Sequence, residues 1–239
     1  MTERSLASEL PIEAVVFDWG GTLTPWHTVD TLAIWMAYAV VYDPDGAQAL
    51  ATRLRDAEET AWAAGRDQHV AATLDGVLRA AGVDPDQARH EAALAAYELA
   101  WEPHTWTDPH TLPLLLALRE RGLRVGVLSN TIWSRDYHER VFARDGVLDY
   151  IDGAVYSSEI AWTKPHPEAF LAAMTAVGVT DPASCVFVGD RPYDDIFGAK
   201  SLGMRGVLIP HSTVPAYDGV VPDAVITRLS ELLPHLDDW

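Results

Sequence analysis

Residues 15–23 read Val-Val-Phe-Asp-Trp-Gly-Gly-Thr-Leu, and this stretch decides the fold. An apolar run that ends abruptly in an acid and two glycines is typical of a buried strand followed by a tight loop. Ligands of open α/β sheets collect at the carboxyl ends of strands, so Asp18 is predicted to stand at a functional site. On its own, the pattern also fits an aspartate that opens an ordinary turn.

The composition is that of a globular protein with a full core. Of the 239 residues, 49% are hydrophobic and 22% are charged, close to the averages for globular domains. The formal net charge of -18 disfavours binding to nucleic acid or to anionic membrane surfaces. A phosphorylated substrate therefore needs a local positive site.

Three features predict a cytoplasmic location. Cys185 is the only cysteine, so it cannot form an internal disulfide, and this suits a reducing compartment. The stretch 1–9 lacks a basic start followed by an apolar run, so no secretory signal is predicted. The longest apolar stretch, 32–41, is too short to span a bilayer.

Residues 28–101 are rich in alanine and predict about four helices inserted after the first strand. In one of them, Leu50, Leu54, Ala57 and Ala61 recur at helical spacing and predict a buried stripe. The charged residues between them are assigned to the exposed face: Arg53, Arg55, Glu58 and Glu59. Another helix is predicted to open at Asp84, with Pro85 at its first position.

From residue 108 onward, helices and strands alternate, which predicts parallel pairing through right-handed crossovers. The predicted strands are 124–129, 153–156, 184–189, 206–209 and 223–226. The predicted helices are 111–121, 134–144, 165–177 and 193–202. The fold class is therefore α/β, with a core formed by 1–24 and 105–239 and a helical cap formed by 25–104.

Two later stretches carry groups that can hold an anion. The apolar run 125–128 ends in Ser129 and Asn130, whose hydroxyl and amide can grip an anion, although this pair is also ordinary turn chemistry. Lys164 precedes Pro165, which is predicted to start a helix and to fix the ammonium beside the helix N-terminus.

A third apolar strand ends in crowded acids at Asp190, Asp194 and Asp195. If the strand ends lie side by side, Asp190 and one of the other two approach Asp18. At ~4 Å and an effective dielectric near ~20, each such pair costs on the order of 4 kcal/mol, so the cluster needs a cation. Oxygen ligands without cysteine or histidine favour Mg²⁺.

Together these stretches resemble the haloacid dehalogenase-like hydrolase superfamily, in order and spacing. Asp18-Trp19-Gly20-Gly21-Thr22 is similar to its first motif. Ser129 matches the second motif, Lys164 the third, and Gly189-Asp190 with the following acids the fourth. The helical insertion resembles the cap of subclass I members.

The resemblance implies a Rossmann-like core and a phosphatase that acts on a small phosphorylated metabolite. It implies that Asp18 attacks phosphorus and forms an aspartyl-phosphate. The groups implied to bind the substrate are Ser129, Lys164, Gly21, Thr22 and Asn130. The ligands implied for Mg²⁺ are Asp18, the Gly20 carbonyl, Asp190 and Asp195. The expected state is a monomer or homodimer.

Gly20 departs from the family pattern, because family phosphatases usually carry there a second aspartate that acts as general acid and base. A missing group of this kind is worth ~10²- to ~10⁴-fold in rate. His27 and His166 are candidate replacements, since histidine titrates near neutrality. The rival interpretation is a phosphate-sensing or scaffolding protein that has lost turnover.

Three kinds of relative also lack this acid, and they offer different chemistries. Dehalogenases carry tyrosine at the position and use no metal, whereas this chain keeps the fourth-motif acids. Phosphonoacetaldehyde hydrolases need a cap lysine for a Schiff base, and residues 28–101 contain none. Phosphate-transferring ATPases have membrane segments without a counterpart here. The tryptophans expected to pack between cap and core are Trp26, Trp101, Trp106 and Trp162.

Overall fold

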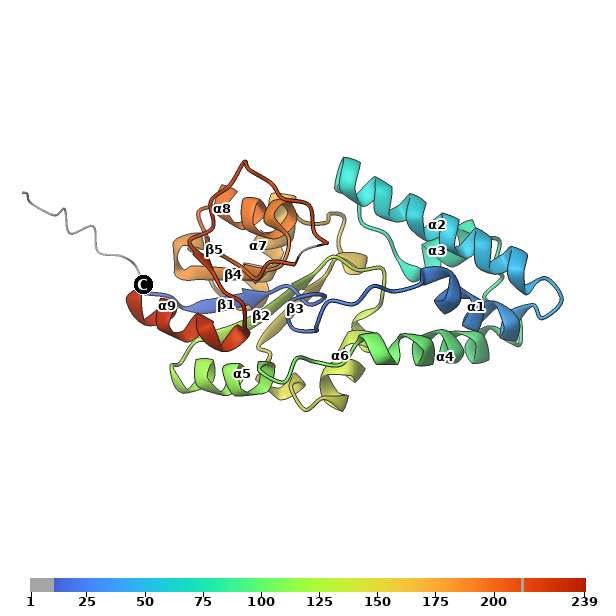
Figure 1. Ribbon diagram of the computed structural model, residues 1–239, viewed down its shortest axis with the longest axis horizontal. Coiled ribbons are helices and arrows are strands. Elements are labelled where there is room, and N and C mark those ends of the chain that lie inside the picture. The colour runs from blue at the N-terminus through green and yellow to red at the C-terminus, as the bar shows by residue number, and fades with distance from the viewer. Residues whose placement is uncertain (1–10, 212) are drawn as a thin grey trace, which may run out of the picture.

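The computed structural model describes residues 11–211 and 213–239, so the stretch 1–9 discussed above lies outside it. Its core is a six-stranded parallel sheet in the order β3-β2-β1-β4-β5-β6, which confirms the predicted α/β class (Figure 1). The strands are β1 (Ala14–Phe17), β2 (Arg124–Ser129), β3 (Gly153–Tyr156), β4 (Cys185–Gly189), β5 (Arg205–Leu208) and β6 (Ala224–Val225).

Helices cover both faces of the sheet, which is why its central strands are continuous apolar runs. One face packs against α5 (Thr111–Glu120), α6 (Arg135–Arg144) and α9 (Leu232–Asp238). The other packs against α7 (Pro167–Ala176) and α8 (Gly198–Ser201). Side chains of β1 alternate between the two cores, Val15 and Phe17 toward the first and Val16 toward the second.

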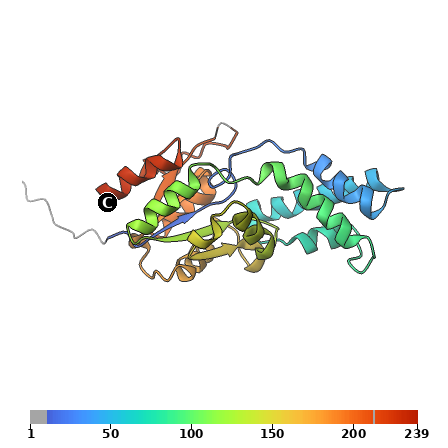
Figure 2. The same ribbon diagram turned by 90° about the horizontal axis from the view of Figure 1, so that it is seen from below.

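Four helices lie together away from the sheet, and we call this group the helical lobe (Figures 1 and 2). They are α1 (Thr31–Tyr42), α2 (Ala47–Gln68), α3 (Leu74–Ala80) and α4 (His90–Trp101). Asp30 caps the N-terminus of α1, because its carboxylate accepts a hydrogen bond from the Ala33 amide. The exact division of the chain into 1–24, 25–104 and 105–239 stays a prediction.

The helical lobe also contacts the core through backbone interactions. Val70 forms an antiparallel bridge with Trp162. The Thr163 amide donates to the His69 carbonyl at 2.9 Å, and the Leu74 amide donates to the Ile132 carbonyl at 2.7 Å. The lobe therefore rests on the loop that carries Lys164.

Two predicted helix starts were wrong for local reasons, and the first part of another predicted helix has π-helical rather than α-helical geometry. The helix expected at Asp84 begins at His90, because the Asp84 carboxylate caps only a turn, accepting from the Asp86 amide. The helix expected at Pro165 begins at Pro167, with His166 as its cap. The helix expected over 193–202 is a π-helical turn, Pro192–Phe197, followed by α8.

The assignment of Glu58 to the exposed face of its helix was also wrong. The buried stripe of α2 runs through Ala47, Leu50, Ala51, Leu54, Glu58 and Gly65, so Glu58 lies on it. Only 6% of Glu58 is exposed.

The helices of the described part of the chain include no candidate for a membrane span, because none combines the necessary length with an apolar composition.

Candidate active site

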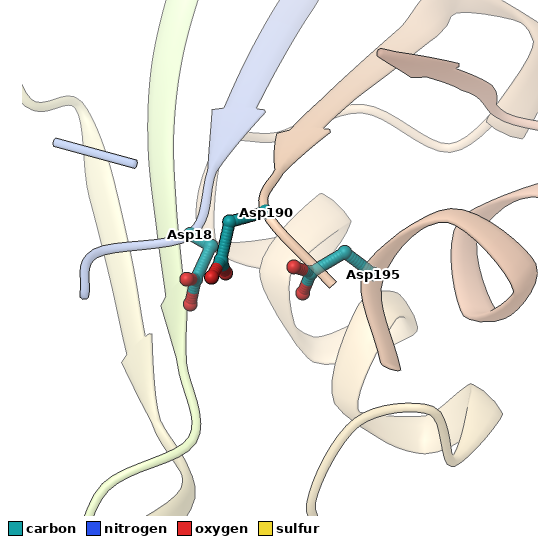
Figure 3. A group of neighbouring side chains, drawn as sticks. All are labelled: Asp18, Asp190 and Asp195. Carbon is teal, nitrogen blue, oxygen red and sulfur yellow. The ribbon is translucent and has the colours of Figure 1, made fainter. Parts of the chain in front are cut away.

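The sheet order brings the predicted motifs together at one edge. β1 lies between β2 and β4, and Phe17 is level with both Val127 and Val188. Asp18 follows Phe17 directly and Asp190 follows Val188 after Gly189, so both acids leave neighbouring strands at the same edge of the sheet. Figure 3 shows their carboxylates and that of Asp195, which comes from the π-helical turn, pointing into one space.

Lys164 lies between two of these acids. Its Nζ donates to Asp18 Oδ1 at 2.6 Å and to Asp195 Oδ1 at 2.7 Å. The side chain is almost fully buried. Burial alone would lower the pKa of Lys164, but the charges of Asp18 and Asp195 outweigh it and raise the pKa, so the ammonium stays charged.

Asp190 is the acid without a partner. Both of its carboxylate oxygens are buried and accept no hydrogen bond from any described residue. Burial and the charges of Asp18 and Asp195 raise the pKa of Asp190 to about 8. One oxygen from each of Asp18, Asp190 and Asp195 lies within 4.8 Å of the others. An orphaned carboxylate in an all-oxygen cluster fits a hard divalent cation such as Mg²⁺.

The alternative between Asp194 and Asp195 is resolved by their placement. Asp195 is fully buried within the cluster, and its Oδ2 accepts from the Arg191 amide at 2.9 Å. Asp194 lies outside the cluster and is 3.8 Å from Arg191 in an ion pair. A side chain at Gly189 would overlap the Asp195 carboxylate, so glycine is needed there for the close approach.

The two glycines of the first loop differ. Gly21 has a φ of +88°, the left-handed region that glycine adopts readily, and His211 Nε2 lies 2.7 Å from its carbonyl oxygen. Gly20 has no such constraint, and a Cβ there would meet nothing within 4 Å. The position that lacks the family's acid is therefore open space next to Asp18.

The other predicted substrate-binding residues have distinct surroundings. Ser129 is buried at the end of β2 and lines the same cavity as Asp18. The Asn130 amide holds the backbone of Lys164, donating to its carbonyl at 3.0 Å and accepting from its amide at 2.8 Å. Thr22 is buried, and its hydroxyl has no partner among residues 11–211 and 213–239.

A cavity of about 650 Å³ lies between the sheet edge and the helical lobe. Two tryptophans expected only as packing, Trp26 and Trp101, line this cavity. The other two do not: Trp106 lies under the Arg144 guanidinium, and Trp162 stacks on His166 at 4.1 Å between ring centroids.

Of the two histidines considered as replacement acids, only His27 lines the cavity. His166 caps α7, where its Nδ1 accepts from the Glu168 amide, and it stacks on Trp162. A second cavity histidine, His104, lies edge-on to His27 at 5.5 Å. Burial and the neighbouring His27 lower the pKa of His104. No motif identifies His104 in the sequence.

Charged cavity residues were also missed, among them Arg191 and Glu58. Arg191 lies 5.8 Å from the ring of Trp26 and adds a second cation beside the acid cluster. Its position directly after Asp190 was the available signal. Glu58 lines the cavity from α2, and its place in the spacing of the buried stripe was the signal there.

A family model described as haloacid dehalogenase-like hydrolase matches residues 12–203, most of the chain. A glyceraldehyde 3-phosphate phosphatase of Methanopyrus kandleri is 34% identical over 164 residues, covering 67% of this chain and 69% of that protein. The residues that the family model matches include all the positions proposed from the four motifs.

Solved structures share the whole architecture. A haloacid dehalogenase-like phosphatase from Thermococcus onnurineus has a TM-score of 0.65 at 25% identity, covering 94% of this chain and 98% of that one. A 2-haloacid dehalogenase from Pseudomonas syringae has a TM-score of 0.68 at 26% identity, covering 95% and 99%. The same architecture therefore occurs in a phosphatase and in a dehalogenase. The two reactions have to be distinguished by the residues of the site.

Proposed function

The chain belongs to the haloacid dehalogenase-like hydrolase family, and from that premise we propose that it is a phosphatase. Its substrate is a small phosphorylated metabolite, and Asp18 is the nucleophile. The phosphatase name of the Methanopyrus kandleri relative supports this reaction class. The single cysteine further supports action in the cytoplasm.

The observation that carries the proposal is the orphaned Asp190 carboxylate beside the Lys164–Asp18 pair. Asp195 is paired with Lys164 even without a metal, but the Asp190 carboxylate has no partner among the described residues and adds like charge next to the nucleophile. A phosphatase can use this carboxylate, because a divalent cation held there offsets the charge of both the acids and the phosphate. The acid cluster therefore favours phosphate chemistry over dehalogenation.

The proposed metal ligands are Asp18, the Gly20 carbonyl, Asp190 and Asp195. When bound, Mg²⁺ supplies positive charge to the phosphoryl oxygens. Asp18 attacks phosphorus, the P–O bond to the organic group breaks, and an aspartyl-phosphate forms while the organic group leaves as its oxyanion, which takes a proton from water. Attack by water on the aspartyl-phosphate then releases phosphate and regenerates Asp18.

The remaining residues position these groups. We assign Lys164, Ser129 and the Gly21–Thr22 loop to the phosphoryl oxygens. Asn130 holds the Lys164 backbone from both sides and so fixes where the ammonium lies. Arg191 adds positive charge at the cavity side of the acids. No side chain at Gly20 protonates the leaving group, so esters of acidic alcohols are the better substrates.

The test is release of phosphate from 4-nitrophenyl phosphate with Mg²⁺ and with EDTA. We expect hydrolysis that requires Mg²⁺ and is abolished by Asp18→Asn, because an amide cannot attack phosphorus. The Asp18→Asn variant should remain folded by circular dichroism. Tight binding of phosphate without turnover would instead support the phosphate sensor, and metal-independent release of halide from 2-haloacids would support a dehalogenase.

A further inference from the structure

Glu58 is a buried acid that the proposed chemistry does not use. It lies on α2 in the helical lobe and lines the cavity opposite the sheet edge. Trp35 Nε1 donates to its Oε2 at 2.7 Å, and Trp62 Nε1 donates to its Oε1 at 3.3 Å. Because an indole can only donate, both carboxylate oxygens are held as acceptors. The side chain is therefore fixed in place.

One cation of the same helix, Arg66, also lines the cavity, but among the described residues it does not pair with Glu58. Glu58 forms no ion pair in the described part of the chain, and the charge nearest in sequence is another acid, Glu59. Burial raises the pKa of Glu58, which records the penalty for keeping the anion out of water. A glutamine could accept a hydrogen bond from one indole without the cost of burying a charge. The buried carboxylate of Glu58 therefore indicates a cationic partner that comes from outside the chain.

The walls around Glu58 are aromatic. Trp62 and Trp101 line the same cavity, and Trp101 stacks edge-on against Trp133 at 4.8 Å. The face of an indole attracts cations, and it attracts them more strongly when water is excluded. A carboxylate that is fixed among tryptophan rings can therefore bind an organic ammonium group.

The size of the cavity points in the same direction. A volume of about 650 Å³ is in the range that holds a ligand of drug size. A triose phosphate, such as the substrate in the name of the Methanopyrus kandleri relative, would leave most of this space filled with water against tryptophan rings. A ligand with a flat apolar body fills it better.

We propose that Glu58 is a specificity residue that binds an ammonium group of the substrate. The substrate class is a phosphate monoester with an apolar, preferably aromatic, body and an amine at the end away from the phosphate. The phosphate then lies at Asp18 and Lys164, and the amine lies against Glu58 and Trp62. This inference rests on the proposed phosphatase function and refines its substrate.

The test uses two esters that differ only in this group. In 4-(2-aminoethyl)phenyl phosphate an ammonium stands where 4-propylphenyl phosphate has a methyl group. Both leaving groups are para-alkyl phenols, so Gly20 affects them alike. We expect kcat/KM to favour the amine by at least about tenfold, as for a hydrogen-bonded buried charge. Equal kcat/KM values for the two esters would overturn the proposal.

The variants are Glu58→Gln and its matched control Glu59→Gln. Glu59 is the next residue on α2, and its side chain is 70% exposed. Glu58→Gln should abolish the preference for the amine while still hydrolysing the propyl ester, and Glu59→Gln should keep the preference. A preference that survives Glu58→Gln in a folded protein would assign the amine to another group and contradict the proposal.

A binding measurement separates this inference from the phosphatase proposal. Calorimetric titration of Asp18→Asn with the two esters needs no turnover. The amine should bind at least about tenfold more tightly, and the added substitution Glu58→Gln should remove the difference. If no ester or 4-nitrophenyl phosphate is hydrolysed by the wild type, the phosphatase proposal fails, and the titration still decides whether Glu58 binds ammonium.

Discussion

At the scale of single residues, most side chains of the site are held tightly by their neighbours, whereas the space next to Gly20 is empty of protein atoms. Lys164 is held through both its ammonium and its backbone, and Gly189 has no room for a side chain. Gly20, by contrast, has open space around its Cβ position and an ordinary φ. The left-handed glycine of this loop is its neighbour Gly21. A side chain at position 20 therefore meets no backbone or steric barrier.

Gly20→Asp should speed hydrolysis of alkyl phosphates by up to ~10²-fold, within the range of general acid–base catalysis. The new carboxyl would protonate the alkoxide that leaves and then activate water. Aryl phosphates, whose leaving groups need little help, should gain much less. The measurement is kcat for an alkyl and an aryl ester, with thermal melting to check that stability is unchanged.

The control for this substitution is Gly20→Asn, which has the same size and no acid–base function. A wild type that already hydrolyses alkyl esters as fast as aryl esters, and that Gly20→Asp slows, would contradict the expectation. The proton would then come from elsewhere, and the cavity histidines His27 and His104 would be the first residues to replace.

Asp190→Asn should stabilise the metal-free protein and remove its response to Mg²⁺. The amide takes an uncompensated charge out of a buried site, so the free energy of unfolding without metal should rise. We expect Mg²⁺ to raise the melting temperature of the wild type, because a ligand that binds only the folded state stabilises it, and this increase should be lost in the variant. Thermal melting with Mg²⁺ and with EDTA measures both effects.

The pH dependence of metal-free stability follows from the same residue. The pKa of Asp190 rises from 3.8 to about 8 on folding, so the folded protein holds this proton more tightly than the unfolded chain. The free energy of unfolding should therefore fall as the pH rises from about 4 to about 8. Asp190→Asn should flatten this slope, and Asp194→Asn should leave the Mg²⁺ response in place. An unchanged slope in Asp190→Asn would refute this account.

At the scale of elements, the strands were predictable and two helix starts were not. β2 and β3 have the predicted bounds because each is an apolar run ended by polar residues. Asp84-Pro85 has the composition of a helix start. In the structure, however, the Asp84 carboxylate accepts from the Asp86 amide in a local turn and caps no helix. Glu58 was assigned to solvent by residue type, although its spacing follows the buried stripe of α2.

The candidate site was predictable as a set of residues but not as a geometry. Asp18, Ser129, Lys164 and Asp190 each end an apolar run or precede a helix, so local patterns locate them. Arg191 directly follows Asp190, which was the available signal for it, whereas His104 follows no pattern and reaches the cavity through tertiary packing. The use of Asn130 to hold Lys164 joins residues 34 positions apart, which spacing alone does not reveal.

Where β4 meets the π-helical turn, Gly189→Ala should damage both stability and turnover. The added methyl group would overlap the Asp195 carboxylate and displace it from Lys164. Overpacking of this kind costs about 1–3 kcal/mol, measured by urea unfolding. Gly20→Ala is the control for stability, because nothing lies near its Cβ. Equal stability of Gly189→Ala and the wild type would show that Asp195 can move without penalty.

At the scale of the whole molecule, the helical lobe lies to one side of the sheet and its covering helices (Figure 1), and the cavity that contains Asp18 is lined by residues of both parts. Asp18 and Lys164 are each less than 10% exposed, and the cavity above them is bounded by the helical lobe. The lobe is tied to the core by the bridge between Val70 and Trp162. We expect that a bulky substrate enters when this contact opens, as in enzymes gated by lids.

A disulfide across the bridge should trap the closed arrangement. Directly opposed residues of antiparallel strands have Cβ atoms about 4.5–5.5 Å apart, near the range that a disulfide accepts. Val70→Cys with Trp162→Cys should therefore lose most phosphatase activity when oxidised and regain it with dithiothreitol. Cys185 is buried and does not compete for the new thiols. Phosphate release from 4-nitrophenyl phosphate before and after reduction is the measurement.

The two single variants are the controls, because they lose the same side chains and cannot form the cross-link. Their activity should not depend on dithiothreitol, whereas that of the double variant should. Activity that is equal in the oxidised and reduced double variant, with the disulfide confirmed by mass spectrometry, would mean that substrate reaches Asp18 without separation of the lobes. The Val70–Trp162 contact would then be a fixed joint, and the lobe would select substrates by the shape of its walls alone.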